Sequence, residues 1–193
     1  MLGAMPPEPD ADLELVARAQ RGDEQAFTDL MTRYQQPVLH FVFRLLSGAA
    51  DAEDVAQETF VRAYFNLRRY RARPEARFST WLFQIARHAA LDQLRKRGRR
   101  AETPWPEGHA EPAAPGPSAD RAMQHQELGE AVALACAALP EEQRAAFVLA
   151  EYHGASVAEI AAVLRTSVRA AEARLFRARQ EMRRRLAAWR TPS

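Results

Sequence analysis

Arginine and aromatic side chains alternate in the run YFNLRRYRARPEARFSTW, residues 64–81. Guanidinium groups can follow a phosphate backbone while rings stack on unpaired bases, so this combination is typical of a surface for single-stranded nucleic acid. Residues 61–100 carry 12 basic and 2 acidic side chains, more than a solvated helix face needs. The individual rings have a plainer explanation, because Phe65, Trp81 and Ile85 have the spacing of a helix core face.

A second basic cluster lies near the carboxyl end of the chain. Residues 156–164 predict a short amphipathic helix, and Arg165 and Thr166 form a minimal turn. Ser167 begins another helix, which bears Arg169, Arg174, Arg177 and Arg179. This is the pattern of a helix-turn-helix, whose second helix enters the major groove with early residues on base edges and later arginines on phosphates. The alternative is an amphipathic hairpin with a solvated basic face, but the net charge of +7 over Arg165–Ser193 favours DNA.

Three carboxylates, Asp51, Asp54 and Glu58, share one side of a predicted helix. Paired carboxylates can bind a metal or act as acid and base, but no histidine lies at ligand spacing and there is no glycine-rich phosphate loop. We therefore expect no metal site, no cofactor and no catalytic residue. Docking on a basic protein surface is the functional interpretation of this acidic stripe, and a solvated helix face is the alternative.

Charge alternates in four blocks along the 193 residues. An acidic block, a strongly basic block, a second acidic block and a second basic block predict two surfaces for polyanions and at least one for a basic partner. The basic and acidic side chains number 4 and 11 in residues 1–60, 12 and 2 in 61–100, 1 and 6 in 101–139, and 10 and 6 in 140–193.

Apolar residues recur at spacings of three and four, and period-two alternation is almost absent, so the sequence predicts an all-α protein. Asp23, Asp51 and Ser79 are expected as amino-terminal caps, and Ser156 with Glu159 has the spacing of a capping box. Gly22, Gly48 and Gly98 are expected to follow helix ends. The predicted helices are 12–21, 23–46 with a bend near Pro37, 51–69, 79–97, 120–139, 141–152, 156–164 and 167–189.

Proline divides the chain, because five of the 12 prolines lie between residues 104 and 117 in an acidic run with few aliphatic side chains. A flexible proline-rich linker between two small helical domains explains this run better than a long loop within one domain. The expected organisation is a disordered amino terminus (1–10), a helical-bundle domain (11–100), the linker (101–119) and a helix-turn-helix domain (120–190).

The single cysteine, Cys136, excludes an internal disulfide framework and fits a reducing compartment. Its alanine and aliphatic neighbours predict a buried small side chain. The amino terminus lacks the basic start and apolar run of a signal peptide, and no apolar stretch approaches the roughly 20 residues that a bilayer requires. We therefore expect an intracellular protein without membrane insertion.

With these pieces in this order, the chain resembles the sigma-70 family in its extracytoplasmic-function branch, over about residues 11–100 and 121–187. The motifs that carry the resemblance are DAEDVAQETF (51–60), similar to the family's core-polymerase-binding helix; FSTWLFQIAR (78–87) with Asp92 and Arg95, similar to its promoter −10 helix; and LPEEQR (139–144) with the helix pair up to Arg179, similar to its −35 domain.

This resemblance implies an alternative sigma factor that directs bacterial core RNA polymerase to promoters in the cytoplasm and catalyses nothing. The acidic helix would bind the β′ clamp helices, and the β flap is a further implied contact. Arg68–Arg77 would capture a flipped-out base of the −10 element, which requires a few kcal/mol of binding energy. The acidic linker would enter the polymerase toward the RNA exit channel, and an anti-sigma factor would mask the protein.

The residues implied by the resemblance form three sets. For core polymerase they are Asp51, Glu53, Asp54, Gln57 and Glu58; for the −10 element Arg68, Arg69, Arg71, Arg77, Phe78, Trp81, Arg87, His88, Asp92, Arg95 and Arg99; and for the −35 element Ser167, Arg169, Glu172, Ala173, Phe176, Arg177 and Arg179.

Four positions depart from the family pattern. His88 replaces a frequent asparagine and could change base choice or titrate near neutral pH. Arg165 replaces a common turn glycine. Glu172 and Ala173 replace a frequent basic residue and a serine, and because a carboxylate accepts a hydrogen bond from the cytosine amino group, we expect a cytosine opposite Glu172.

Two other function classes account for less of the sequence. A free-standing helix-turn-helix regulator explains residues 140–190 but leaves the acidic helix and the first basic block without a role, and binding to core polymerase separates it from a sigma factor. A nucleic-acid-processing enzyme would need a metal or nucleophile constellation, whereas the five histidines are scattered along the chain.

Overall fold

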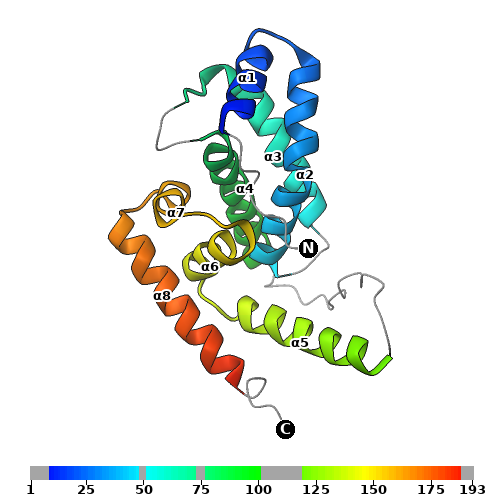
Figure 1. Ribbon diagram of the computed structural model, residues 1–193, viewed down its shortest axis with the longest axis vertical. Helices are drawn as coiled ribbons and strands as arrows, with labels where there is room; N and C mark the ends of the chain where they lie inside the picture. Colours follow the sequence, from blue (N-terminus) through cyan, green and yellow to red (C-terminus); the bar gives the residue numbers. More distant parts are fainter. Residues whose placement is uncertain (1–8, 48–50, 73–76, 101–118, 188–193) are drawn as a thin grey trace.

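The computed structural model describes residues 9–47, 51–72, 77–100 and 119–187. Every regular element within these ranges is a helix, as the periodicity predicts (Figure 1). No helix among them is both long and apolar enough to cross a membrane. The elements are α1 (Pro9–Gln20), α2 (Glu24–Leu46), α3 (Ala52–Asn66), the 3-10 helix η1 (Leu67–Arg69), α4 (Phe78–Arg100), α5 (Ala119–Ala137), α6 (Glu141–His153), α7 (Val157–Leu164) and α8 (Val168–Arg185).

Capping chemistry sets several boundaries as expected. The Asp23 carboxylate accepts a hydrogen bond from the Ala26 N–H at 3.1 Å, and Gly22 takes a φ of +95° in the turn before it. Two expected boundaries are wrong. Helix α4 begins at Phe78, so Ser79 lies inside its first turn, and the helix continues through Gly98 because the backbone there keeps a negative φ.

The first helix is tied to the rest of the amino-terminal half by polar contacts. Helix α1 starts at Pro9, so residues 9 and 10 are helical rather than disordered; a proline fits the first helical position because it needs no N–H partner there. The buried Asp12 carboxylate accepts hydrogen bonds from the Tyr34 hydroxyl and the Arg33 guanidinium. The expected disorder of residues 1–8, Gly48 as a helix end, and the linker segment 101–118 lie outside the described residues.

Helices α2, α3 and α4 form the core of the amino-terminal half, with Tyr34, Phe41 and Phe83 fully buried. The Phe41 and Phe83 rings meet edge to face with centroids 5.1 Å apart. The side-chain amide of Gln20 in α1 donates to two backbone carbonyls, of Leu67 at 2.8 Å and of Tyr70 at 2.9 Å. These bonds fix the chain where it leaves α3, next to the start of α4.

The carboxyl-terminal half packs directly on the amino-terminal half. His153 at the end of α6 lies against Phe83 of α4 and Phe41 of α2, with ring centroids 4.9 and 6.0 Å apart. The Arg44 guanidinium lies 3.8 Å from the centre of the Tyr152 ring. In Figure 1, α6 and α7 lie beside α4, so one hydrophobic core runs through both halves. The two-domain organisation that the sequence predicts does not indicate that the two halves touch.

His153 is 2% exposed, and neither of its ring nitrogens has a hydrogen-bond partner among the described residues. Burial lowers the pKa of this imidazole to about 4, and the positive charges of His40 and Arg44 act in the same direction. The folded protein therefore holds His153 in its neutral form at neutral pH.

We predict that His153 makes stability depend on pH in a defined window. In the unfolded chain the histidine pKa is about 6.5, so the unfolded state binds more protons between pH 6.5 and 4, and stability falls as pH falls through that range. At pH 5 this effect is worth about 2 kcal/mol. Urea titrations at pH 7.5 and 5 should show a smaller pH dependence for His153→Leu than for wild type, whereas the exposed-site control Gln36→Leu should behave like wild type. Equal pH dependence in all three proteins would disprove this.

Candidate nucleic-acid and partner interfaces

One exposed face of α3 carries four of the acidic-stripe residues. Glu53, Asp54, Gln57 and Glu58 are all exposed, and because three- and four-residue spacing keeps side chains on one side of a helix, Asp54, Gln57 and Glu58 lie in one row. Glu58 accepts a salt bridge from Arg62 at 2.8 Å. A solvent-facing carboxylate row can bind a basic partner without a large desolvation cost.

The same face of α3 continues as an exposed apolar patch. Val61, Tyr64 and Phe65 are 54%, 50% and 76% exposed, and Tyr64 also packs edge to face on Phe27 with centroids 5.1 Å apart. The expectation that Phe65 belongs to the core is wrong. The missed signal was the spacing, since residues 61, 64 and 65 continue the row of the acidic side chains toward the end of the helix.

Asp51 has a different position from the other acidic residues. Its carboxylate receives hydrogen bonds from Arg97 at 2.8 Å and Gln93 at 2.6 Å, both on α4, and it makes no capping bond to α3. Asp51 therefore joins α3 to α4 within the amino-terminal half.

A cavity of about 280 Å³ opens between the end of α3, η1 and the exposed side of α4. Its wall combines two aromatic rings with cationic and amide groups, which is the composition expected around an unstacked base. The residues that line it are Arg62, Asn66, Arg69, Tyr70, Trp81, Ile85 and His88.

The aromatic wall of this cavity packs against the buried ring of Phe78. Trp81 lies against Tyr70 and Phe78, with ring centroids 5.0 and 5.6 Å apart. Burial raises the pKa of the Tyr70 phenol to about 12, so it stays protonated. Phe78, expected to contact DNA, is only 3% exposed and packs on Tyr34 as well. It therefore supports Trp81 from behind rather than facing solvent.

Three arginines lie on the segment that follows α3, and one of them, Arg69, lines the cavity. Arg68, Arg69 and Arg71 are exposed, and Arg71 donates to the Arg68 carbonyl at 2.9 Å. Of the expected base-capturing segment Arg68–Arg77, residues 73–76 lie outside the description, and the cavity lies between that segment and α4.

Three further members of the −10 set lie along α4. Asp92 pairs with Arg62 at 3.1 Å and with Arg95 at 3.5 Å, so its carboxylate orients two cations rather than standing alone. Arg99 lies near the end of α4, where only the backbone is described.

His88 forms part of the cavity floor and is half-buried. Burial is the main cause that lowers its pKa, and the neighbouring charges of Arg87 and Arg165 lower it further. The expectation that His88 titrates near neutral pH is therefore not supported, because the ring stays neutral there.

Two members of the −10 set face the other half of the chain. The Arg87 guanidinium, 6% exposed as a residue, donates to Glu141 at 3.2 Å and to Glu142 of α6. Arg77 pairs with Glu159 of α7 at 3.5 Å. In this arrangement neither side chain points at the cavity.

Helices α7 and α8 form the predicted helix-turn-helix. Ser156 and Glu159 make the expected capping box, with the Ser156 N–H donating to the Glu159 carboxylate at 2.9 Å. Arg165 ends α7 with a φ of +53°, a left-handed conformation that costs a non-glycine residue roughly 1 kcal/mol or more. Arg174 donates to Thr166 at 2.7 Å and so fixes α8 relative to the turn.

The exposed face of α8 carries most of the −35 set. The Ser167 hydroxyl accepts the Ala170 N–H at 3.2 Å and caps the helix. Phe176 is exposed, Ala173 is half-buried, and Arg179 pairs with Glu151 at 2.7 Å. The other exposed members are Arg169, Glu172 and Arg177.

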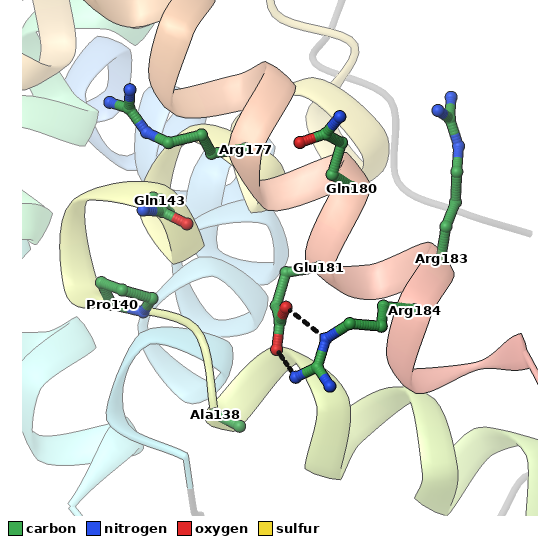
Figure 2. Close-up of a pocket in the computed structure, with 8 residues that line it drawn as sticks. All are labelled: Ala138, Pro140, Gln143, Arg177, Gln180, Glu181, Arg183 and Arg184. Atoms are coloured by element: carbon green, nitrogen blue, oxygen red, sulfur yellow. Dashed lines mark hydrogen bonds and ion pairs between the residues drawn. The ribbon is translucent and has the colours of Figure 1, made fainter.

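A broad polar hollow of about 810 Å³ lies between the start of α6 and the last turns of α8 (Figure 2). Arg184 bridges the Glu181 carboxylate at 2.6 Å, and this hydrogen bond is the main cause that lowers the pKa of Glu181 to about 2. Arg177 and Arg183 lie on the same helix around the hollow. The residues that line the hollow do not combine a nucleophile with a base or with metal ligands. No group of three metal-ligating side chains occurs in the described part of the chain.

Comparison with protein families assigns both halves. The family model of sigma-70 region 2 matches residues 30–100, and the model of sigma-70 region 4 matches residues 129–182. Together the two matches cover more than half of the chain.

Whole-length relatives include the RNA polymerase sigma-H factor of Pseudomonas aeruginosa, 37% identical over 180 residues that cover 89% of this chain and 91% of that protein. The ECF RNA polymerase sigma-E factor of Escherichia coli is 35% identical over 178 residues, covering 88% and 91%. Among solved structures, CnrH in complex with the cytosolic domain of CnrY matches 93% of this chain and 99% of that chain with a TM-score of 0.67 and 31% identity. The sigma factor RpoE in complex with the anti-sigma factor NepR from Bartonella quintana matches 83% and 96% with a TM-score of 0.69 and 25% identity.

We predict that the capping box of α7 is needed for the stability of the helix-turn-helix. Ser156→Ala removes the hydroxyl that accepts the Glu159 N–H and should lower the free energy of unfolding by about 1 kcal/mol. Thr28→Ala, whose hydroxyl bonds only to a carbonyl inside α2, serves as the control and should change stability by less than about 0.5 kcal/mol. Chemical denaturation followed by circular dichroism measures the free energy of unfolding of each variant. Equal losses for the two variants would contradict a stabilising role of the capping box.

Proposed function

Because the chain belongs to the extracytoplasmic-function branch of the sigma-70 family, whose members direct RNA polymerase to promoters, we propose how its own residues divide that work. It is an alternative sigma factor and not an enzyme. The observation that carries the proposal is the opposite chemistry of two neighbouring helices: α3 exposes an acidic and aromatic face, and α4 forms one wall of a basic and aromatic cavity.

The exposed face of α3 is the docking surface for core polymerase. Asp54, Gln57 and Glu58 supply charge and hydrogen-bond acceptors for a basic helix, and Tyr64 with Phe65 supply apolar area at the other end. Such a mixed surface fits the clamp helices of the β′ subunit, since charge steers association while buried aromatic area holds the complex. Asp51 contributes by holding α3 on α4.

The cavity beside α4 receives the −10 element as single-stranded DNA. Trp81 offers a face for base stacking, and Arg62 and Arg69 lie where they can meet phosphate or a base edge. His88, neutral and half-buried, can act as a hydrogen-bond donor or acceptor toward a base without adding charge. Arg68, Arg71 and Arg95 provide the surrounding phosphate contacts.

Helix α8 reads the −35 element in the major groove. Arg169, Glu172 and Ala173 lie on its first turns, where a recognition helix meets base edges, and Arg177 and Arg179 lie further along for phosphates. Phe176 adds an exposed ring suited to a thymine methyl group.

The proposal extends to the linker, to further protein partners and to the location of the protein. Residues 101–119 connect the two DNA-binding halves as an acidic linker inside the polymerase, and the −35 half contacts the β flap. The complexes of the related CnrH and RpoE with CnrY and NepR support an anti-sigma partner for this chain. Action on bacterial promoters places the protein in the cytoplasm. The free-standing regulator is disfavoured, because the region 2 match accounts for the half that it leaves without a role.

We predict that both parts of the α3 face are needed for core polymerase binding. Asp54→Lys and Phe65→Ser should each weaken binding to purified core polymerase about tenfold or more, the first through charge repulsion and the second through lost apolar area. Glu24→Lys, a similar charge reversal on exposed α2, is the matched control. Titration of fluorescently labelled protein without DNA measures the dissociation constants. Unchanged affinity of both variants would remove α3 from the docking surface.

We further predict that Glu172 selects cytosine. A −35 library transcribed by core polymerase with this protein should be enriched in cytosine at one position, because the carboxylate accepts from its amino group, a contact worth about 1–3 kcal/mol. Glu172→Ala should lose that preference and keep the rest of the consensus, and Glu127→Ala on exposed α5 should keep all of it. Sequencing of the selected promoters decides, and an identical consensus for wild type and Glu172→Ala would contradict the assignment.

A further inference from the structure

The side chain of Gln20 joins the end of α1 to the short turn that follows α3. Its amide group donates two hydrogen bonds, to the Leu67 carbonyl at 2.8 Å and to the Tyr70 carbonyl at 2.9 Å. Leu67 begins η1 and Tyr70 directly follows it, and they lie 47 and 50 residues from Gln20 in the sequence. One side chain therefore holds both ends of this turn.

The hydrogen bonds within the turn fix its shape but not its orientation. The Tyr70 N–H donates to the Leu67 carbonyl at 3.0 Å, and Arg71 donates to the carbonyls of Arg68 and Tyr70 at 2.9 and 3.0 Å. These three bonds join residues 67–71 to one another and do not reach another helix. The two bonds from Gln20 come from α1, so they orient the turn relative to the rest of the amino-terminal half.

The end of α1 that carries Gln20 is itself held in place. Arg18 pairs with Asp23 at 2.8 Å, and the Asp23 N–H donates to the Arg18 carbonyl at 3.2 Å. The same Asp23 carboxylate caps α2 through the Ala26 N–H at 3.1 Å. Gln20 therefore lies beside a junction that both α1 and α2 fix.

The turn held by Gln20 forms part of the wall of the cavity beside α4. Arg69 and Tyr70 line this cavity, and the Tyr70 ring lies against Trp81 with centroids 5.0 Å apart. A shift of the turn would move the Tyr70 ring away from Trp81 and displace the Arg69 guanidinium. Binding groups are effective only when they are held within about 0.5 Å of the right geometry, so the position of this backbone matters for the whole wall.

We propose that Gln20 is a positioning residue for the cavity beside α4: its two hydrogen bonds hold η1 so that Arg69 and Tyr70 meet an unstacked base that enters beside Trp81. Gln20 lies outside the lining of the cavity and acts through the turn. This inference rests on the proposed function, which places the single-stranded −10 element in this cavity.

A purely structural role for Gln20 would have a different consequence for DNA binding. If the two bonds only stabilised the fold, their loss would lower the fraction of active protein and weaken the binding of every DNA equally. If the bonds position the cavity wall, their loss removes the contribution of the captured base alone. The ratio of the dissociation constants for two DNAs that differ only in that base separates the two roles.

The test uses the full chain bound to purified core polymerase and a fluorescent single-stranded oligonucleotide with the −10 element of a library-selected promoter. A series of oligonucleotides carries an abasic site at one position at a time, and fluorescence anisotropy gives each dissociation constant. For wild type, the abasic site at the captured position should weaken binding about fivefold or more, as expected for the loss of one stacked base. Gln20→Met keeps the length of the side chain without its donors and should lower this ratio to about twofold or less.

The matched control is Gln25→Met, because Gln25 is an exposed glutamine whose amide donates to Asp29 within α2 at 2.9 Å. This control should keep the wild-type ratio, and Trp81→Ala, which removes the stacking ring, should lower it. Gln20→Asn, whose amide is one carbon short of the two carbonyls, replaces Gln20→Met if circular dichroism shows that Gln20→Met is not folded. Both Gln20 variants should bind core polymerase as wild type does, because the exposed face of α3 is unchanged.

A wild-type ratio in the folded Gln20 variant, beside a lowered ratio in Trp81→Ala, would overturn the positioning role, whether or not the overall affinity falls. An equal loss of affinity for core polymerase and for DNA would also overturn it, since that result indicates a general loss of structure. If Trp81→Ala keeps the wild-type ratio, or if no abasic site weakens wild type, the cavity does not receive a base. The proposed function of the cavity then fails, and the role of Gln20 fails with it.

Discussion

The buried charge of Arg87 is the constraint on which the arrangement of the chain depends. A guanidinium is stable in a nearly solvent-free position only when acidic groups compensate it, and the groups that do so are Glu141 and Glu142, more than fifty residues further along the chain. This requirement brings the start of α6 onto α4. The contacts of Arg144 with the end of α2 and of His153 with two phenylalanines follow from the same placement.

Helix α4 consequently makes a different contact on each of three sides. One side completes the core with α2 and α3, its outer surface forms a wall of the cavity proposed for the −10 element, and a third side is covered by α7. A change in the packing of α4 therefore affects both the cavity and the contact between the halves.

The two proposed partner surfaces, on α3 and beside α4, lie close together and differ in the sign of their charge. Arg62 lies between them, paired with Glu58 on α3 and with Asp92 on α4. The acidic face of α3 favours a basic protein helix, and the arginines around the cavity favour phosphate, so each partner is repelled from the surface of the other.

The sequence alone determined the features that depend on nearby residues. Helical periodicity, the caps at Asp23 and Ser156, the helix-turn-helix and the charge blocks all follow from interactions within a few positions, which is why they could be predicted. The tertiary structure decided which side of each helix is covered. It exposed Phe65, buried Phe78 behind Trp81, and turned Arg87 toward the other half of the chain. Spacing marks a face as apolar or basic, but the residues that cover that face come from distant parts of the chain, so only packing determines whether a ring or a guanidinium meets solvent.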